Sequence, residues 1–453
     1  MPVTAVARRT VARCVLAGAL AGQAAVLGYG LNHQFSARIL WTESVAIVLF
    51  LVALVALARS GLPVRSALAG IVCVGFGFQL VALTSGPTSS DDAYRYGWDA
   101  KVQLAGVDPY RYPPQDRALD RLRTGTLFPD RSGCAWELAG GRCSLVNRPS
   151  VHTVYPPVAE AAFTASRVLS FASTDGTLPV QVLGALGATA VAVLLAVRAG
   201  RGGHPPWTVA IWSWCPVTVV EIGNNAHIDW LAVLFSIGAL MALRGRRPAW
   251  SGGLLGAAIA TKLYPALLVV SMLRRSPARV IAAAAAVVVL SYVPHVIAVG
   301  TDVIGFLPGY LREERYVSGG RFMLLDVVLP KALLSPVGAV VLVSVGAWAM
   351  RRSDPGCPEL TAVVVVGVAL MVTTPGYAWY ALLLLALVAM SGRLEWLSMV
   401  IAATIAMLGG PEVGDGVVLR TCCFAAGAAV TAAWLAAGRP GMPRPAWRAL
   451  PPA

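Results

Sequence analysis

Apolar runs of about the length that spans a lipid bilayer recur along the whole chain and constrain its fold more than any other feature. Of the 453 residues, 57% are hydrophobic and only 13% are charged, whereas soluble proteins carry about 25% charged residues. The mean hydropathy of +0.69 agrees with this pattern. The sequence therefore predicts an all-α, polytopic membrane protein with about 12–14 membrane helices.

Arginine clusters between the apolar runs set the predicted orientation, because short cytoplasmic loops are enriched in Lys and Arg. Arg8, Arg9 and Arg13 precede the first run and no clear cleavage site follows, so we expect a retained first helix with a cytoplasmic N-terminus. The net charge of +14 lies mainly in these clusters, which meet anionic lipid, and does not indicate a nucleic-acid partner. The predominance of arginine over lysine, with abundant Ala, Gly and Val, suggests a high-GC bacterial genome.

The predicted spans are 12–31, 39–58, 65–84, 155–172, 178–198, 206–222, 227–243, 249–273, 279–299, 332–350, 359–375, 377–391, 394–409 and 417–437. They place the loops 85–151, 222–228, 300–331, around 375 and 409–416 outside the plasma membrane. Arginines flank both ends of 249–273, so this run is expected to enter and return as two halves broken near Lys262. Similarly, one segment of 155–198 is expected to be interfacial or re-entrant.

Three regions follow from this map: N-terminal membrane helices at 1–84, an outer loop at 85–151, and a membrane core at 152–453 that carries the outer loop 300–331. Cys134 and Cys143 lie in the exported loop, an oxidising location, with two glycines between them. This spacing suits a hairpin closed by a disulfide; the alternative is two unpaired thiols. No CxxC motif or Cys/His cluster predicts a zinc site.

Asp91 and Asp92 are the candidate catalytic carboxylates, because they open the polar loop immediately outside a predicted helix end. In the functional interpretation, one of them takes a proton from an attacking hydroxyl group. In the alternative, both simply cap the helix that begins near Ala93, a task for which Thr88, Ser89 and Ser90 are equally suited.

The segment SDDAYRYGWDAKVQLAGVDPYRYPP, residues 90–114, resembles the first outer loop of the GT-C superfamily of glycosyltransferases. The resemblance is closest to the bacterial family 87 mannosyltransferases, which use polyprenyl-phosphate mannose. The matching positions are Asp92, Tyr94, Tyr96, Trp98-Asp99 and 106–110, with Ala100 in place of the family's usual glycine. Further pieces recur in order at 154–157, 225–229, 261–265 and 375–380.

This resemblance implies a GT-C fold in which the long first outer loop is catalytic. It implies an inverting hexosyltransferase that moves mannose from a polyprenyl-phosphate carrier to a glycan or glycolipid hydroxyl during cell-envelope biosynthesis. Asp92 aligns with the family's aspartate and would be the base, and the donor's head group would lie beneath the loop. No cofactor is required, because the leaving group is a lipid monophosphate, although Asp91 and Asp92 could bind a divalent ion weakly. The expected partners are the lipid-linked donor, a lipoglycan or glycolipid acceptor and membrane lipids.

Other residues are candidates for substrate binding. His227 and Asp229 begin a span at its outer end, where Asn224 and Asn225 offer the alternative of a helix cap. Lys262 inside an apolar run is a candidate phosphate ligand, because an intramembrane lysine is costly without a partner; snorkelling or an Asp pair is the alternative. The remaining predicted contacts with the donor or acceptor are Tyr94, Arg95, Tyr96, Trp98, Tyr264, Arg321, Tyr377, Trp379 and Tyr380.

For two of these groups a structural interpretation is also open. Arg321 follows the cluster 312–315, whose arginines either hold phosphate bidentately or belong to a self-paired, solvated i,i+3 charge cluster. The aromatic residues at 377–380 either stack on the substrate or belong to an interfacial aromatic belt.

Other functions remain open at this stage. The same residues would serve transfer of arabinofuranose from a polyprenyl carrier. A transporter or flippase would carry internal repeats with matched broken helices, and no convincing repeat is visible. A non-catalytic assembly protein would tolerate Asn at Asp92. The acceptor, the linkage position and the oligomeric state do not follow from the sequence.

Overall fold

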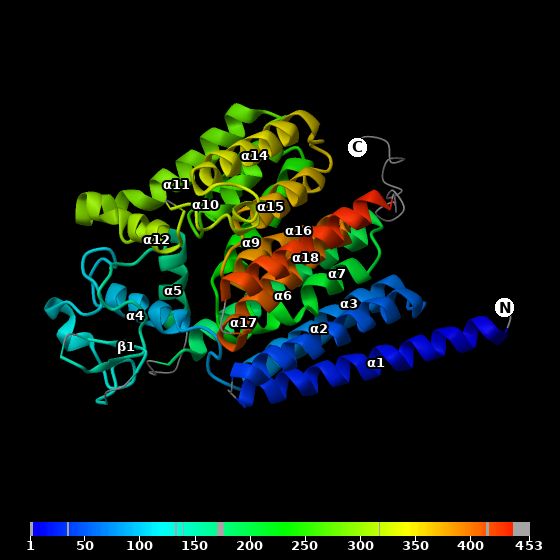
Figure 1. Ribbon diagram of the computed structural model, residues 1–453, viewed down its shortest axis with the longest axis horizontal. Coiled ribbons are helices and arrows are strands. Elements are labelled where there is room, and N and C mark those ends of the chain that lie inside the picture. Colours follow the sequence, from blue (N-terminus) through cyan, green and yellow to red (C-terminus); the bar gives the residue numbers. More distant parts are fainter. Residues whose placement is uncertain are drawn as a thin grey trace.

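The computed structural model describes residues 3–33, 36–131, 134–138, 140–169, 176–316, 318–413 and 416–437. The chain is almost entirely helical (Figure 1). The longer helices are α1 (Val3–Asn32), α2 (Ser36–Arg59), α3 (Val64–Ala82), α4 (Asp92–Leu104), α5 (Pro157–Leu169), α6 (Leu178–Gly202), α9 (Asp229–Arg244), α10 (Pro248–Ile259), α11 (Pro277–Val299), α14 (Lys331–Arg352), α15 (Glu359–Thr373), α16 (Leu382–Ser391), α17 (Leu397–Val413) and α18 (Gly416–Ala436).

Short helical segments and one pair of strands connect them. They are η1 (Arg117–Leu122), α7 (Trp207–Ser213), α8 (Pro216–Thr218), the π-helix η2 (Val219–Asn224), η3 (Tyr264–Ser271), η4 (Gly300–Ile304), α12 (Leu307–Glu313), α13 (Met323–Asp326), η5 (Ala378–Ala381) and η6 (Leu394–Trp396). The strands β1 (Trp136–Glu137) and β2 (Cys143–Ser144) pair antiparallel.

Seven helices within the described ranges are long and apolar enough to cross a membrane, or eight if the sharply bent pair Pro216–Asn224 and Asp229–Arg244 counts as one span. Three further apolar helices, Glu359–Thr373, Ala378–Ser391 and Leu394–Gly410, are shorter. The predicted class, an all-α polytopic membrane protein, is confirmed. The number of helices of full membrane length is lower than the 12–14 predicted, because several apolar runs form short or broken helices.

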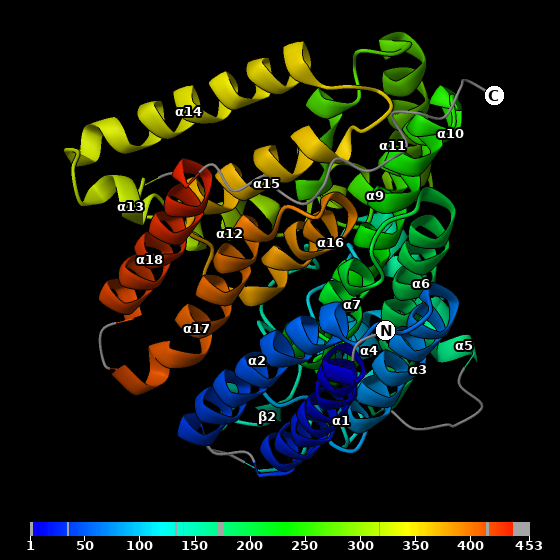
Figure 2. The ribbon, with the colours of Figure 1, turned by 90° about the vertical axis from the view of Figure 1, so that its right-hand side faces the viewer.

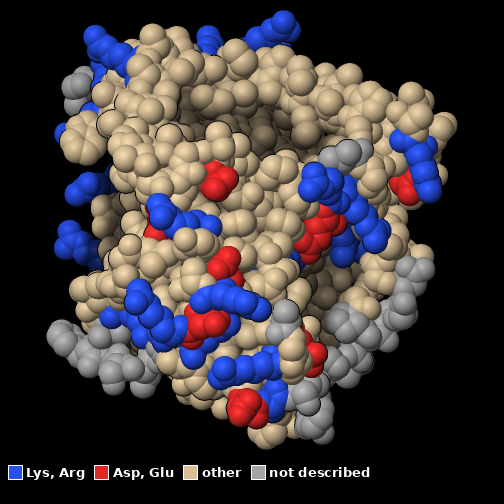
Figure 3. Space-filling model, turned by 90° about the vertical axis from the view of Figure 1, so that its left-hand side faces the viewer, with Lys and Arg blue, Asp and Glu red and all other residues tan. Residues whose placement is uncertain are grey.

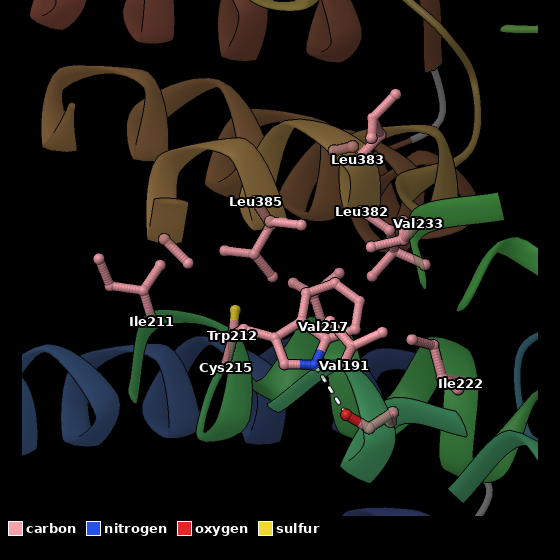
Figure 4. Close-up of a cluster of buried hydrophobic side chains, with 14 of the residues drawn as sticks. Val191, Ile211, Trp212, Cys215, Val217, Ile222, Val233, Leu382, Leu383 and Leu385 are labelled. Carbon is pink, nitrogen blue, oxygen red and sulfur yellow. Dashed lines mark hydrogen bonds between the residues drawn. The ribbon is translucent and has the colours of Figure 1, made fainter. Parts of the chain in front are cut away.

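The helices surround a core that is apolar on all sides. Every residue of α16 from Leu382 to Met390 is buried, so this helix lies at the centre of the bundle (Figure 2). Trp212 packs among Val191, Val217 and Leu385, and its indole N–H donates to the carbonyl of Ala188 at 2.9 Å (Figure 4). The buried tryptophan thus fills the core while its polar atom is satisfied.

The molecule has two distinct ends. We name the end that carries α4, α5 and the two strands the loop end; α1 begins and α18 ends at the opposite end (Figure 1). Arg198, in the last turns of α6, pairs with Glu359 at the start of α15. Arg274 donates to the carbonyls of Arg351 and Ser353. These contacts gather the arginine-rich loops at the end opposite the loop end, which we name the arginine end.

Both predicted irregularities correspond to features of the structure. Of the two segments in 155–198, α6 is a full span, whereas α5 has 13 residues and runs across the direction of α1–α3 (Figure 1). The run 249–273 is interrupted between α10 and η3, at residues 260–263. Ser353 donates to the carbonyl of Ser271, so η3 ends at the arginine end, where α10 also begins after Arg247.

Glycines let α10 approach α11 closely. A Cβ atom added to Gly252 would lie 2.2 Å from the carbonyl oxygen of Val280, and one added to Gly256 would lie 2.5 Å from that of Ala284. Small residues at i and i+4 allow membrane helices to pack backbone to backbone. This close packing supports the half-helix α10 and thereby the chain break that carries Lys262.

Candidate functional site

The outer loop folds into a unit with its own small core. Trp98 of α4 packs edge-on against Phe128, with ring centroids 5.0 Å apart, among buried apolar residues of the same loop. A disulfide joins Cys134 to Cys143, whose Cα atoms are 5.8 Å apart, and closes the β1–β2 hairpin. The loop is therefore a rigid support for the residues at the start of α4.

A buried ionic network ties α4 to α5 within this unit. The Nε atom of Arg95 lies 3.0 Å from both carboxylate oxygens of Asp99, and both side chains are buried. Glu160 of α5 accepts hydrogen bonds from Thr153 and from Gln103. Burial raises the pKa of Asp99 despite Arg95, and burial together with the charge of Asp99 raises the pKa of Glu160 well above its usual range.

Asp91 and Asp92 are held by side chains rather than used as helix caps. Asp91 occupies the N-cap position of α4, but its side chain makes no capping hydrogen bond. The amide of Asn147 donates to one oxygen of each aspartate, at 2.9 Å for Asp91 and 2.6 Å for Asp92. The Tyr155 hydroxyl donates to the other oxygen of Asp92 at 3.0 Å, and the Trp136 indole donates to Asp91. The two carboxylates are thus fixed in position by neutral donors.

His227 lies behind Asp92 and away from solvent. Its Nδ1 atom is 3.6 Å from Asp92 Oδ2, and its Nε2 atom is 3.3 Å from Glu221 Oε2. Its ring stacks on Trp379 with centroids 3.8 Å apart. The side chain is completely buried. The expectation that His227 faces the substrate is corrected, because its ring is enclosed between Asp92, Glu221 and Trp379.

Asn224 and Asn225 join this region to the outer loop instead of capping α9. Asn224 accepts hydrogen bonds from the backbone and hydroxyl of Thr88, and Asn225 accepts from the backbone amides of Thr88 and Ser89. Asn225 also donates to Glu221 at 3.3 Å. The two amides therefore hold the chain that leads into Asp92 against the π-helix η2.

Lys262 combines an ion pair with exposure to a cavity. Its Nζ atom lies 3.1 Å from Asp229 Oδ2, and Tyr264 donates to the other carboxylate oxygen at 3.0 Å. The ammonium group also lies 5.6 Å from the Tyr155 ring centroid and 5.9 Å from that of Tyr380. The pairing with an aspartate left open by the sequence is present, and Lys262 lines the cavity as well.

Asp91, Asp92 and Lys262 line one cavity of about 720 Å³. One part is polar and aromatic and is lined by Asp91, Asp92, Asn147, Tyr155, Lys262, Tyr264, Tyr310, Arg321, Tyr377, Trp379 and Tyr380. The other part is apolar and runs between η3, α14 and α15, where Leu267, Val270, Leu342, Val366 and Leu370 line it. The face at the loop end carries clustered acidic and basic side chains, with a hollow among the uncharged residues beside them (Figure 3). The cavity thus offers a polar region and an apolar groove in continuity.

Arginines near the cavity mouth pair with carboxylates from other segments. Arg321 forms a buried ion pair with Glu314, and its guanidinium lies 5.2 Å from the Tyr316 ring centroid. Arg148 pairs with Glu313 of α12. The acidic residues of 312–315 therefore pair with Arg321 and Arg148, and among the described residues no i,i+3 pair forms within the segment.

Several predicted substrate contacts do not line the cavity. Tyr96 is buried and stacks on Phe163 with centroids 4.2 Å apart. Trp98 and Tyr94 pack in the small core of the outer loop. Arg95 touches the cavity, but its guanidinium is engaged by Asp99. Tyr94, Tyr96 and Trp98 are thus used for packing, whereas Arg95 forms an ion pair at the cavity wall. A contact of these residues with substrate stays a prediction.

Some site residues have no counterpart among the predicted ones. Glu221 stands alone in an apolar run, which is a signal that sequence reasoning could have used. Arg420 of α18 packs its guanidinium against Gly376, beside cavity residues 375 and 377. Its buried Nε atom has no hydrogen-bond partner in the described part of the chain. Asn147 is distant in sequence from every motif, so only the fold brings it to Asp92.

A test for metal-binding geometry gives no candidate. Among the described residues, no group of three or more His, Cys, Asp or Glu side chains is arranged so that it could hold a metal ion. Asp91 and Asp92 each have an oxygen that accepts from Asn147, so neutral donors already occupy part of their coordination capacity.

Comparison with known proteins gives one family match, over part of the chain. The model of glycosyltransferase family 87 matches residues 153–375, which include η2, α9, the break at Lys262 and the outer loop with Arg321. Searches of curated proteins and of solved structures give no match. The resemblance to family 87 seen in the sequence is confirmed over these residues.

Proposed function

We propose that this membrane glycosyltransferase of family 87 transfers mannose from a polyprenyl-phosphate carrier to a hydroxyl group of a glycan or glycolipid, with inversion. The observation that carries the proposal is the continuity of the cavity, in which an oriented carboxylate and an apolar groove share one space. A donor with a charged head group and a long hydrocarbon chain needs both environments, because neither a phosphate nor an isoprenoid is stable in the other's surroundings.

The polar part of the cavity suits a single displacement at the anomeric carbon. Asp92 accepts the proton of the acceptor hydroxyl, whose oxygen attacks as the bond from that carbon to the lipid phosphate breaks. Tyr155 and Asn147 orient the carboxylate through the two bonds that they donate. Because attack and departure occur on opposite faces of the sugar, the configuration inverts.

Basic groups would stabilise the departing phosphate. Lys262 keeps N–H donors for a ligand while Asp229 balances its charge, and Arg321 has a similar relation to Glu314. Arg420 adds a guanidinium at the same wall, close enough to interact electrostatically with Arg321 and Glu314. Donors held in position before the reaction stabilise developing charge most effectively in a cavity that excludes water.

The orientation follows from the two ends of the molecule. We place the arginine end in the cytoplasm and the loop end on the outer face of the plasma membrane, because cytoplasmic loops carry the excess of Lys and Arg. The outer location agrees with the disulfide between Cys134 and Cys143, since such bonds persist in oxidising compartments. The acceptor, a lipoglycan or glycolipid in this proposal, would approach from that side.

The test is transfer by purified protein in liposomes, with radiolabelled polyprenyl-phosphate mannose and a membrane lipid extract as the source of acceptors. We expect labelled product with wild-type protein and almost none with Asp92→Asn, and linkage analysis then defines the product. If the protein instead uses polyprenyl-phosphate arabinofuranose, mannose is the wrong donor sugar but the proposed mechanism still applies. Labelling of single cysteines in 85–151 from the cytoplasmic side would refute the orientation.

A further inference from the structure

Glu221, His227 and Asp92 form a line of polar groups that leads from the protein interior to the cavity. The distances are 3.3 Å from Glu221 Oε2 to His227 Nε2 and 3.6 Å from His227 Nδ1 to Asp92 Oδ2. Both are ion-pair distances, and neither imidazole nitrogen has a hydrogen-bond partner among the described residues. The side chain of Asp92 is 14% exposed and lines the cavity, whereas those of His227 and Glu221 are 0% and 1% exposed. His227 can therefore exchange a proton with the cavity only through Asp92.

An irregular backbone builds this arrangement. Glu221 lies in the π-helix η2, a rare conformation that is frequent at functional sites. Ala226 then adopts a φ of +60°, which is unfavourable for a residue with a Cβ atom and persists only where the surroundings enforce it. The turn lets the His227 amide donate to the Glu221 carbonyl at 2.9 Å. The chain is thus bent so that the imidazole lies over the Glu221 carboxylate.

Two neighbours of His227 can stabilise a proton that its ring takes up. In the described part of the chain, no basic side chain other than His227 lies within ion-pairing distance of Glu221. A buried carboxylate without a counter-charge is costly, so Glu221 gains when the imidazole is protonated. The face of Trp379, 3.8 Å from the imidazole centroid, also attracts a cation.

We propose that His227 and Glu221 form a proton relay behind Asp92, an inference that rests on Asp92 being the base of the proposed reaction. Before the reaction His227 is neutral, with its proton on Nε2 toward Glu221 and a lone pair on Nδ1 toward Asp92. The acceptor proton moves to Asp92 and then to Nδ1, and Glu221 balances the imidazolium. When the products leave, the proton returns through Asp92 to water, so one proton is conserved and no co-reactant is needed.

The relay explains why a second base is useful. Asp92 alone would remain protonated beside the departing phosphate and would have to release its proton into a cavity filled by product. Transfer to His227 restores the Asp92 carboxylate while the positive charge stays in a site with a fixed counter-ion. His227 and Glu221 therefore act through Asp92 and do not contact the substrate.

Chemical rescue distinguishes a role of His227 in proton transfer from a purely structural role. His227→Ala should lower kcat by about 10²-fold, within the range of general acid–base groups, with little change in the KM for the donor. Imidazole and more basic methylimidazoles should restore turnover in the order of their basicity. Pyrazole, which has the same shape but is a much weaker base, should not. Equal rescue by pyrazole and imidazole, or failure of every imidazole to rescue, would overturn the relay.

His204→Ala is the matched control, because His204 follows α6 at the arginine end and does not line the cavity. Its activity should equal that of wild type with and without imidazole. If Asp92→Asn keeps wild-type turnover, the proposed base itself fails. If Asp92→Asn is inactive and His227→Ala behaves like wild type, the relay alone fails.

A second measurement does not depend on the donor. The chain has five histidines, so ¹⁵N-histidine NMR spectra with and without His227→Asn assign the ring of His227. We expect a neutral ring protonated at Nε2 at neutral pH, and a ring protonated at Nδ1 in Glu221→Gln, whose amide would donate to Nε2. A ring that is permanently doubly protonated, or protonated at Nδ1 in the wild-type protein, would exclude the relay.

Discussion

Two groups of buried carboxylates lie near the loop end and differ in what balances their charge. Asp99 and Glu160 have a permanent cation in Arg95 and saturated hydrogen bonds, and they tie α4 to α5. Asp92 and Glu221 have neutral donors and, in His227, a partner that can gain a proton, and the charge of Glu221 also acts on the buried Glu43. The cation that balances the first group keeps its charge at neutral pH, whereas the partner of the second group can change its charge, and one member of the second group faces the cavity. Burial of acidic residues therefore marks function only where the counter-charge can change.

The largest effect should come from Asp92→Asn, which removes the base but keeps a side chain of the same shape. We expect a loss of transfer of about 10²- to 10⁴-fold, because a positioned base contributes this much. The melting temperature should change little, since the neutral donors Asn147 and Tyr155 can still bond to the amide oxygen. Asp91→Asn should be milder, because Asp91 makes no contact with His227.

The transfer activity is measured as the initial rate with saturating donor, and the melting temperature by thermal unfolding in detergent. Near-wild-type turnover by Asp92→Asn would show that the second carboxylate group is as structural as the first.

Arg95→Met is expected to show the reverse of Asp92→Asn, namely a loss of stability with little effect on the chemical step. Removing one member of a buried ion pair typically costs about 3–5 kcal/mol, because the remaining charge is left uncompensated. Activity should then fall only in proportion to the unfolded fraction. Arg117→Met, at an exposed position of the same loop, is the control and should change the stability by less than about 0.5 kcal/mol.

Proteolysis of the outer loop, followed alongside the transfer rate, separates the two outcomes. A stable but inactive Arg95→Met protein would place the first carboxylate group in the chemistry and remove the distinction between the two groups.

Lys262 combines the two roles that are compared here, because it balances the charge of buried Asp229 and also lines the cavity. The sequence predicts that Lys262→Met weakens donor use and leaves folding nearly intact. The ion pair with fully buried Asp229 changes this expectation, since Met at 262 leaves a carboxylate without a counter-charge. Lys262→Met should therefore be less stable than the double variant Lys262→Met/Asp229→Asn.

Both variants should lose affinity for the donor if Lys262 holds the phosphate. Donor KM and thermal stability, measured for the two variants side by side, provide the check. A double variant that is stable and has the wild-type donor KM would leave Lys262 with a structural role only.

The all-α membrane class was predictable because each apolar run carries its own local signal, but only seven or eight helices among the described residues reach full membrane length. The segments that must be irregular, 155–198 and 249–273, were also predictable from charge, because flanking arginines violated simple alternation. Their conformations were not, since they depend on tertiary contacts such as the hydrogen bonds that Gln103 of α4 donates to Glu160 of α5. Local charge thus indicates which segments are irregular but not how they pack.

The sequence could propose as site residues those whose type implies one chemistry. Asp92 and Lys262 line the same cavity although 170 positions separate them in the chain. The aromatics after Asp92 could not be assigned to one use, because Tyr96 and Trp98 have the same sequence signature whether they bind sugar or fill a core. Only the packing of Phe163 and Phe128 against them distinguishes the two uses.

The smallest effect concerns the pH dependence of the first carboxylate group. The pKa of Glu160 is raised in the folded protein by burial and by Asp99. A carboxyl group with a raised pKa contributes stability that is fully present below its unfolded pKa of about 4.3 and is lost as pH rises through the folded pKa. Wild-type protein should therefore lose stability of the α4–α5 contact as pH increases from about 4.3 toward the raised value.

Glu160→Gln should remove this loss, because an amide stays neutral at every pH. It is expected to be the less stable protein at low pH, where its amide nitrogen replaces one of the two oxygens that accept from Gln103 and Thr153, and to gain on wild type as pH rises. Hydrogen exchange of residues 92–104, measured in both proteins from about pH 4.3 upward, gives the pH at which their local stabilities become equal. If the stabilities of the two proteins change in parallel with pH, Arg95 alone balances the charge of the group. If wild type instead becomes more stable relative to Glu160→Gln as pH rises, Glu160 is ionised in the folded protein, like a conventional salt-bridge partner.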